Sequence, residues 1–141
     1  MPGTVVGIHV TPEFEQLPEP VEAVDVTAEG VQGDRYFGRK NLTLIEAEAL
    51  EGLFEDTGIQ LSAAESRRQV LTRGIRLNEL VGRRFMVGGV ECIGEEWCEP
   101  CSHLEGLTQP GVMRGLVHRA GLRADIVQGG RIGVGDDVEE A

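Results

Sequence analysis

The feature that most limits the fold of this chain is a series of short strand-like segments separated by glycines, with no regular alternation of strands and helices. Alternating apolar and polar residues predict separate strands over residues 4–10, 21–27 and 69–72. Two further stretches, residues 83–94 and 123–140, each place strand-like segments on both sides of a Gly-Gly dipeptide, which accepts the positive φ angles of a tight turn. Each of these two stretches is therefore predicted to form a hairpin.

Helical patterns are fewer. Thr43 and Glu46 match a capping box, in which the two side chains satisfy free amides at a helix start, so a helix is expected to begin there. Ser62 and Glu65 match the same motif and predict another short turn of helix. A second short helix is predicted within residues 111–121.

The balance of these elements predicts an α+β, β-rich fold, built around a small, distorted and partly closed β-barrel with a few short helices. A length of 141 residues suits one compact domain, so we expect residues 1–141 to form a single domain. The longest apolar runs are a handful of residues, and the N-terminus lacks the basic and apolar regions of a signal peptide. We therefore expect a cytoplasmic protein without a membrane partner.

The net charge of −11 argues against nucleic-acid binding, because a protein must neutralise phosphates to hold a duplex. Basic residues are nevertheless clustered: residues 1–34 have none, and all but one of the 13 are arginines. The planar fork of arginine suits oxyanions, although a codon bias would give the same ratio. Arg73, at the end of a predicted strand and followed by glycine, is placed to hold an anion, whereas simple alternation puts Arg67 and Arg68 on opposite faces. The alternative is a solvated edge strand whose charges prevent aggregation.

A second polar stretch is the glycine-bracketed loop GDRYFGRKN, residues 33–41. It supplies Asp34, Arg35, Tyr36 and Arg39 within a few positions. Such a loop is typical of a binding site, and the alternative is an Asp34–Arg35 pair that only fixes a turn.

The three cysteines differ in context. Cys92 shares a strand face with Val90 and is predicted to be a small core residue. Cys98 and Cys101 follow that strand, and four interpretations remain open for them. A thioredoxin-like redox pair has the right C-x-x-C spacing but lacks the β-α-β context. A zinc site formed with Cys92 and His103 would require Cys92 to leave its strand face.

The other two interpretations of this pair need no second thiol. Both cysteines are then unreactive loop residues, or one of them is a reactive thiolate. A thiolate of that kind is activated by a nearby cation, such as His103, or by backbone amides.

Five segments stand in a fixed order along the chain: GDRYFG, TLIEAEAL, RRQVLTRGIRLNELVGRRFMVGGVECIG, CEPCSHLEG and HRAGLRADIVQGGRIGVGD. Together they resemble the MOSC domain, the module named after the C-terminal part of molybdenum-cofactor sulfurases. The resemblance covers roughly residues 5–138. Its most specific parts are the arginine-rich run, the P-C element and the closing G-G-x-I-x-x-G-D.

The resemblance implies a β-rich fold around a distorted barrel, with a site made of an essential cysteine and arginines. The P-C element falls on Pro100 and Cys101, which assigns Cys101 as the catalytic cysteine and the metal ligand. In MOSC proteins this cysteine is thought to carry sulfur as a persulfide or to ligate molybdenum. The residues implied to bind the molybdenum cofactor (molybdopterin), an anionic pterin with a phosphate, are Arg35, Arg67, Arg68, Arg73, Asp34 and Tyr36.

Two departures from the family pattern concern this pocket: Tyr36 stands where many members have His, and Gln69 stands where Asn is common. The implied function is handling of molybdenum cofactor or sulfur, with sulfur transfer or the reduction of N-hydroxylated compounds as the reaction. The alternatives are a non-catalytic sulfur-delivery module, or a domain with only a redox-labile Cys98–Cys101 pair. No pyridoxal-phosphate desulfurase domain is recognised, so a separate cysteine desulfurase or a molybdoenzyme is the expected partner.

Overall fold

The computed structural model describes residues 2–13, 17–98, 108 and 110–141. Its strands are β1 (Gly3–Val10), β2 (Glu19–Pro20), β3 (Ala23–Thr27), β4 (Gly30–Val31), β5 (Asn41–Glu46), β6 (Val70–Arg73), β7 (Arg84–Val87), β8 (Val90–Trp97), β9 (Leu122–Gln128), β10 (Gly130–Gly133) and β11 (Asp137–Glu140). Its helices are α1 (Ala47–Thr57), α2 (Ala63–Ser66), the 3₁₀ turn η1 (Leu77–Leu80) and α4 (Val112–Gly115).

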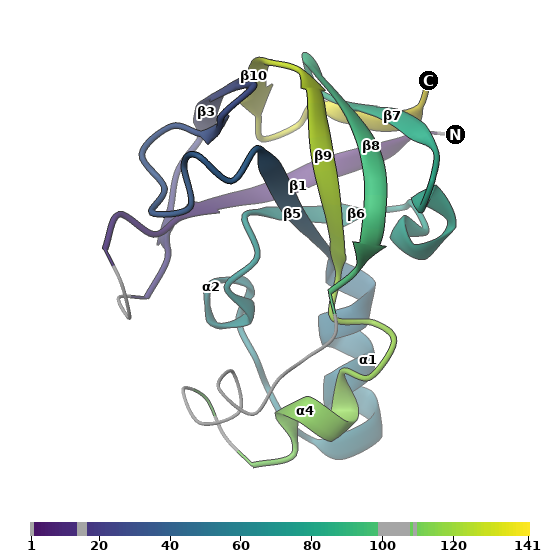
Figure 1. Ribbon diagram of the computed structural model, residues 1–141. Coiled ribbons are helices and arrows are strands. Elements are labelled where there is room, and N and C mark those ends of the chain that lie inside the picture. The colour runs from purple at the N-terminus through teal and green to yellow at the C-terminus, as the bar shows by residue number, and fades with distance from the viewer. Residues whose placement is uncertain (1, 14–16, 99–107, 109) are drawn as a thin grey trace.

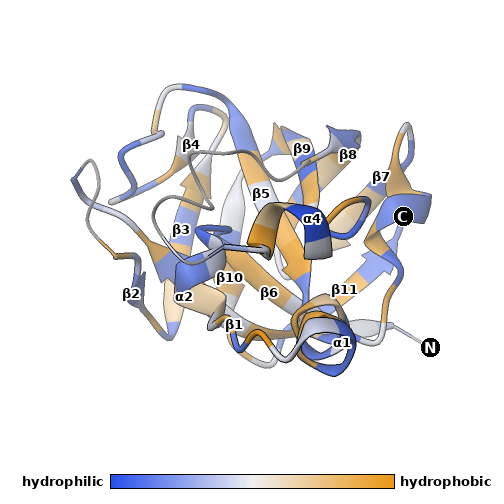
Figure 2. Ribbon diagram, turned by 90° about the horizontal axis from the view of Figure 1, so that it is seen from below, coloured by the Kyte–Doolittle hydropathy of each residue, from blue (hydrophilic) through white to orange (hydrophobic). Residues whose placement is uncertain are grey.

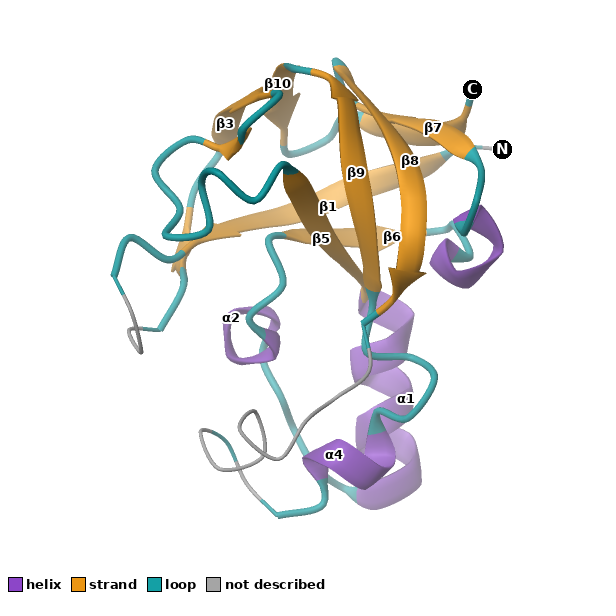
Figure 3. Ribbon diagram, in the orientation of Figure 1, coloured by secondary structure: helices purple, strands orange, loops and turns teal. Residues whose placement is uncertain are grey.

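The strands form a closed barrel (Figures 1 and 3). Neighbours follow the order β11-β7-β8-β9-β5-β6-β1, and β1 pairs with β11 through Gly3 and Val138 to complete the ring. Most pairs are antiparallel, but β5 and β6 run parallel with helix α1 in the connection between them. A small second sheet, β10-β3-β4, lies against one end. The predicted β-rich barrel is confirmed, and it is closed rather than partly closed.

Two separate apolar clusters hold the described part of the fold together. The larger fills the barrel and includes the fully buried Phe85, Leu42 and Cys92, which confirms Cys92 as a core residue. The smaller packs α1 against α4 and is centred on Leu53 and Leu116. These helices lie below the barrel in Figure 1 and in front of it in Figure 2, which is seen from below. Each large apolar side chain buried in this way stabilises the fold by about 1.5–3 kcal/mol. Among the described helices, none is long and apolar enough to cross a membrane.

The capping box predicted at Thr43 is wrong. Strand β5 continues through Glu46 because Thr43 pairs with Arg123 of β9, and α1 begins only at Ala47. The tertiary pairing of this segment therefore overrides a local capping motif. The helix then ends at Gly58, which adopts a left-handed conformation with φ of 77°.

The predicted cap at Ser62 is confirmed. The amide of Glu65 donates to Ser62 Oγ over 3.1 Å, and the Ser62 amide donates to Glu65 Oε1 over 3.0 Å. These reciprocal bonds start α2. The helix predicted over residues 111–121 is shorter than expected, since α4 spans only Val112–Gly115.

One predicted hairpin is correct and the other is wrong. Strands β7 and β8 pair across Gly88-Gly89, as expected. The segments around Gly129-Gly130 do not pair with each other: β9 pairs with β5 and β8, whereas β10 pairs with β3. At Gly129 the chain passes so close to Val26 that a Cβ atom would lie 2.4 Å from its carbonyl oxygen. The glycines thus allow the chain to cross from the barrel to the small sheet.

Candidate functional site

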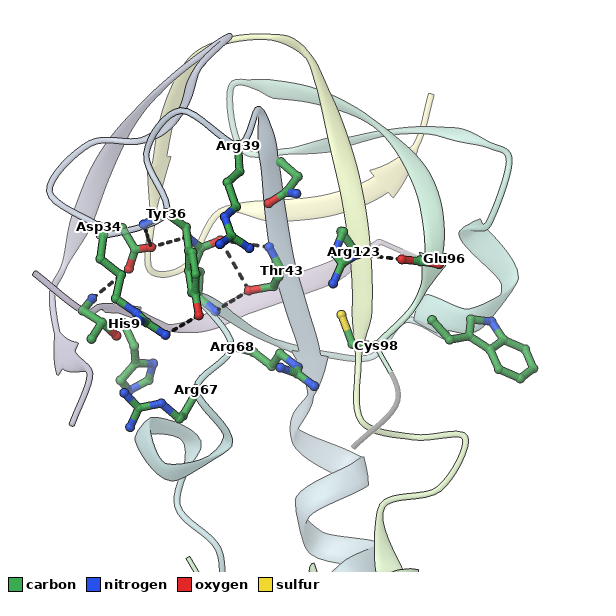
Figure 4. Close-up of a pocket in the computed structure, with 15 residues that line it drawn as sticks. His9, Asp34, Tyr36, Arg39, Thr43, Arg67, Arg68, Glu96, Cys98 and Arg123 are labelled. Carbon is green, nitrogen blue, oxygen red and sulfur yellow. Dashed lines mark hydrogen bonds and ion pairs between the residues drawn. The ribbon is translucent and has the colours of Figure 1, made fainter. Parts of the chain in front are cut away.

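A pocket of about 650 Å³ opens at the side of the barrel where the loop before β5 meets the connection from α2 to β6 and the end of β8 (Figure 4). Five stretches of the described chain line it. Its described lining residues are His9, Thr11, Asp34, Arg35, Tyr36, Arg39, Asn41, Thr43, Arg67, Arg68, Gln69, Glu96, Trp97, Cys98 and Arg123.

The described lining of this pocket is positively charged on a protein whose net charge is −11. It carries five guanidinium groups, from Arg35, Arg39, Arg67, Arg68 and Arg123, against the carboxylates of Asp34 and Glu96. An acidic protein with one cationic cleft concentrates small anions there while it repels polyanions such as nucleic acid.

The buried carboxylate of Asp34 ties the loop to its surroundings. Its Oδ1 accepts from the Thr11 amide over 2.8 Å, and its Oδ2 accepts from the Tyr36 amide over 3.1 Å and from Gln69 Nε2 over 3.0 Å. Gln69 Oε1 in turn accepts from the Thr43 amide over 2.9 Å. Since these bonds satisfy Asp34 within the protein, its role is to fix the loop that carries the neighbouring arginine and tyrosine.

Arg67 and Arg68 both line this pocket. Helix α2 ends at Arg67 in a left-handed conformation with φ of 63°, so the two arginines and Gln69 precede β6 and all three line the pocket. The prediction that strand alternation separates the two arginines was therefore wrong. Arg68 Nε donates to the Ala120 carbonyl over 2.8 Å, which anchors its guanidinium.

Tyr36 organises two further arginines. The Cζ atoms of Arg35 and Arg39 lie 4.2 and 4.5 Å from the centroid of its ring, and Arg35 Nη2 donates to its hydroxyl oxygen. Cation–π contacts of this kind favour a fixed orientation of the guanidinium groups. The ring thus keeps two cations close together despite their mutual repulsion.

Cys98 places a thiol in the same pocket. Its side chain is buried, and its amide donates to the Gly121 carbonyl over 2.8 Å. Burial raises the pKa of this thiol, whereas the nearby charges of Arg68 and Arg123 act in the opposite direction. Arg123 also donates to Glu96 Oε1 over 2.6 Å at the pocket edge. The free protein therefore holds Cys98 mainly as a thiol beside two cations that favour the thiolate.

Most of the residues predicted to bind a ligand meet here. Asp34, Arg35, Tyr36, Arg67 and Arg68 all line the pocket. Cys101, predicted as the catalytic and metal-binding cysteine, lies outside the described residues, as does His103.

Arg73 does not join the other predicted ligand-binding residues. It pairs with Glu51 of α1 over 2.6 Å, and about half of each side chain is exposed. The reason is that Arg73 ends β6 on the side facing α1, away from the connection that carries Arg67 and Arg68.

A family model described as the MOSC domain matches residues 20–139. The chain belongs to the MOSC family. The resemblance found in the sequence motifs is thereby confirmed. A search of curated proteins found no match.

Solved structures support the MOSC fold. The YuaD protein from Bacillus subtilis is 16% identical with a TM-score of 0.88, and the alignment covers 99% of this chain and 96% of that one. YiiM from Geobacillus stearothermophilus is 18% identical with a TM-score of 0.80, covering 99% of this chain and 75% of that one. YiiM from Escherichia coli is 16% identical with a TM-score of 0.75, covering 100% and 70%.

Sequence reasoning missed several lining residues of this MOSC domain. His9 sits on β1 between the core residues Ile8 and Val10, so alternation could have placed it opposite the core. Arg123 reaches the pocket because β9 pairs with both β5 and β8. Because residues 123–140 were predicted to pair with each other in a hairpin, the pairing of β9 with β5 and β8 was not expected.

The described residues contain no group of three or more His, Cys, Asp and Glu side chains that could hold a metal ion. Cys92 lies in the barrel core, so it cannot join a zinc site with Cys98. The described lining of the pocket instead offers guanidinium groups and the Cys98 thiol. This set of groups suits an anionic ligand and is not a protein-only metal cage.

Proposed function

We propose that this MOSC protein binds molybdenum cofactor in the arginine-lined pocket and uses a cysteine sulfur as a molybdenum ligand or persulfide carrier. The observation that carries the proposal is that five arginines and the Cys98 thiol line one pocket. The arginine forks suit the phosphate of an anionic pterin, and a thiolate sulfur suits its metal. When bound, the cofactor would supply a molybdenum centre for atom-transfer chemistry.

Different residues would have different roles in binding and chemistry. Arg67 and Arg68 are placed to hold the anionic part of the ligand, and the Asp34–Gln69 bond keeps the opposite loop in position. Cys101 is proposed as the working sulfur on the strength of the P-C motif. It follows the pocket residue Cys98 by three positions. Cationic guanidinium groups would favour the deprotonated sulfur that either role needs.

The proposed reaction is sulfur transfer or the reduction of N-hydroxylated compounds, in the cytoplasm. Sulfur would come from a separate cysteine desulfurase, or the chain would act together with a molybdoenzyme. A second candidate is delivery of sulfur without turnover, and it is favoured by the same thiol beside cations, because they would also stabilise a persulfide anion.

The test is metal analysis and intact mass of protein purified from a host that makes molybdenum cofactor. We expect molybdenum in the wild type, little in Cys101→Ser and reduced occupancy in Arg68→Gln. Arg73→Gln is the matched control, since Arg73 is an arginine outside the pocket lining. Molybdenum retained in Cys101→Ser would exclude the ligand role. A gain of one sulfur without molybdenum, after incubation with desulfurase and cysteine, would favour the delivery function.

A further inference from the structure

His9 lines the pocket and has a buried ring nitrogen without a hydrogen-bond partner among the described residues. It stands near the end of β1, where its amide donates to the Gln69 carbonyl over 2.7 Å, and its ring is half-buried. In Figure 4, His9 and Arg67 lie on one side of the pocket, while Cys98 and Arg123 lie on the other. The imidazole is therefore remote from the thiol.

The two ring nitrogens of His9 have different surroundings. Nδ1 is buried and has no hydrogen-bond partner among the described residues. Every other buried side-chain nitrogen or oxygen of the described residues has a partner. Nε2 makes no hydrogen bond to a described residue either, but it is not buried in this way. Nε2 is thus the ring nitrogen that is left to meet solvent, and His9 lines the pocket.

The difference between the two nitrogens determines which of them carries the proton of the neutral ring. A neutral imidazole carries one N–H, and a buried N–H without an acceptor is rarer and more costly than an unmet acceptor. The proton therefore belongs on Nε2, where water or a ligand can accept it.

The same difference favours the neutral form of the His9 ring over the cationic form. A cationic ring would place a second N–H on Nδ1, where no described acceptor exists. The charged residues on the elements packed against this end of β1 include Glu19 of β2, Glu65 of α2 and Arg67, and none of them provides that acceptor. Burial also lowers the pKa of His9, in agreement with the geometry.

We propose that His9 is a specificity-determining residue of the pocket, where it presents a neutral Nε2–H donor to an acceptor oxygen on the end of the ligand remote from Cys98. The ligand class is an anion with a phosphate-type oxygen at that end, held by Arg67 and hydrogen-bonded by His9. A neutral donor selects for an acceptor oxygen without adding charge. The proposal rests on the proposed function of the pocket as an anion site.

Long-range ¹H–¹⁵N NMR tests the tautomer directly. At pH 7 we expect the His9 spectrum of a neutral ring with the proton on Nε2, assigned by its loss in His9→Gln. Addition of inorganic phosphate should shift the Nε2 signal while the ring stays neutral. A proton on Nδ1, or a cationic ring, would overturn the proposal.

Phosphate titrations of two variants test the binding role. Gln places its amide nitrogen near the Nε2 position, whereas Asn places it near Nδ1, so His9→Gln should retain phosphate affinity and His9→Asn should weaken it by about three- to tenfold. His118→Gln, outside the pocket lining, is the control. Equal affinities for all three variants would refute the role of His9. If neither the wild type nor Arg68→Gln binds phosphate, the result would instead refute the anion pocket itself.

Discussion

Gln69 Nε2 donates to Asp34 Oδ2 over 3.0 Å and joins two segments that lie 35 residues apart in the sequence. Both side chains are buried, and the other end of the Gln69 amide accepts from Thr43. One amide thus connects the loop that carries Arg35 and Tyr36 to β5 of the barrel. A carboxylate could accept at both ends but could not donate to Asp34.

We expect Gln69→Glu to lower the free energy of unfolding by about 2–4 kcal/mol, because it replaces a donor with a second carboxyl beside the buried Asp34. The proximity of Asp34 would raise the pKa of the introduced carboxyl above its ordinary value. The loss should therefore be smallest near pH 4 and grow as the pH rises to 8.

Urea denaturation at pH 5 and pH 8 measures this effect. Gln69→Asn is the control, since it keeps the amide but shortens its reach, and its loss should not depend on pH. A loss for Gln69→Glu that is equal at both pH values would show that the two carboxyl groups do not interact.

The sequence predicted the barrel, and five of the residues it assigned to ligand binding line the pocket, but its errors have physical causes. Local patterns succeeded where a turn or cap is self-contained, as at Ser62 and at Gly88. They failed at Thr43, where pairing with Arg123 decides the conformation. Arg67 was placed wrongly because its left-handed conformation breaks the alternation expected of a strand. Such errors arise wherever contacts between distant segments outweigh local preference.

Gly121 lies where β9 begins and cannot accept a side chain. Its φ is 120°, and a Cβ atom would lie 2.2 Å from the Leu44 carbonyl oxygen. Gly121→Ala should therefore destabilise the protein by roughly 2 kcal/mol or more and disturb Cys98, whose amide donates to the Gly121 carbonyl.

The matched control for this substitution is Gly135→Ala. Gly135 has a φ of 98° but open space around it, so its loss should come from backbone strain alone, about 1 kcal/mol. Thermal unfolding of both variants gives the comparison. Equal losses would mean that the close approach to Leu44 is relieved by a small shift of the chain.

The reactivity of Cys98 should depend on Arg68. In a Cys101→Ser background, alkylation by iodoacetamide should rise with pH to a midpoint above that of an ordinary cysteine, since burial raises the pKa of Cys98. Arg68→Gln removes a charge that lowers this pKa, so alkylation at pH 8.5 should become slower. Burial raises the pKa of Cys92 to about 12, which keeps it from contributing. Faster alkylation in Arg68→Gln would show that Arg68 acts by covering the thiol.

Protein stability should also report the charge of His9. Because burial lowers the pKa of His9 in the folded state, the unfolded chain binds a proton more readily, and the free energy of unfolding should fall as the pH drops below about 6.5. The slope from this one group cannot exceed about 1.4 kcal/mol per pH unit. His9→Gln should show a smaller fall between pH 7.5 and pH 5.5 in urea titrations. An identical fall in both proteins would mean that protonation of His9 does not change the free energy of unfolding.

The pairing of β1 with β11 sets the order of events during synthesis. Gly3 meets Val138 to close the ring, so the barrel must wait until β11 has left the ribosome, however early β1 emerges. Until then β7 and β1 each lack β11 as a neighbour, and the barrel interior stays open between them. A truncation that removes β11 should therefore aggregate and not leave a smaller folded barrel.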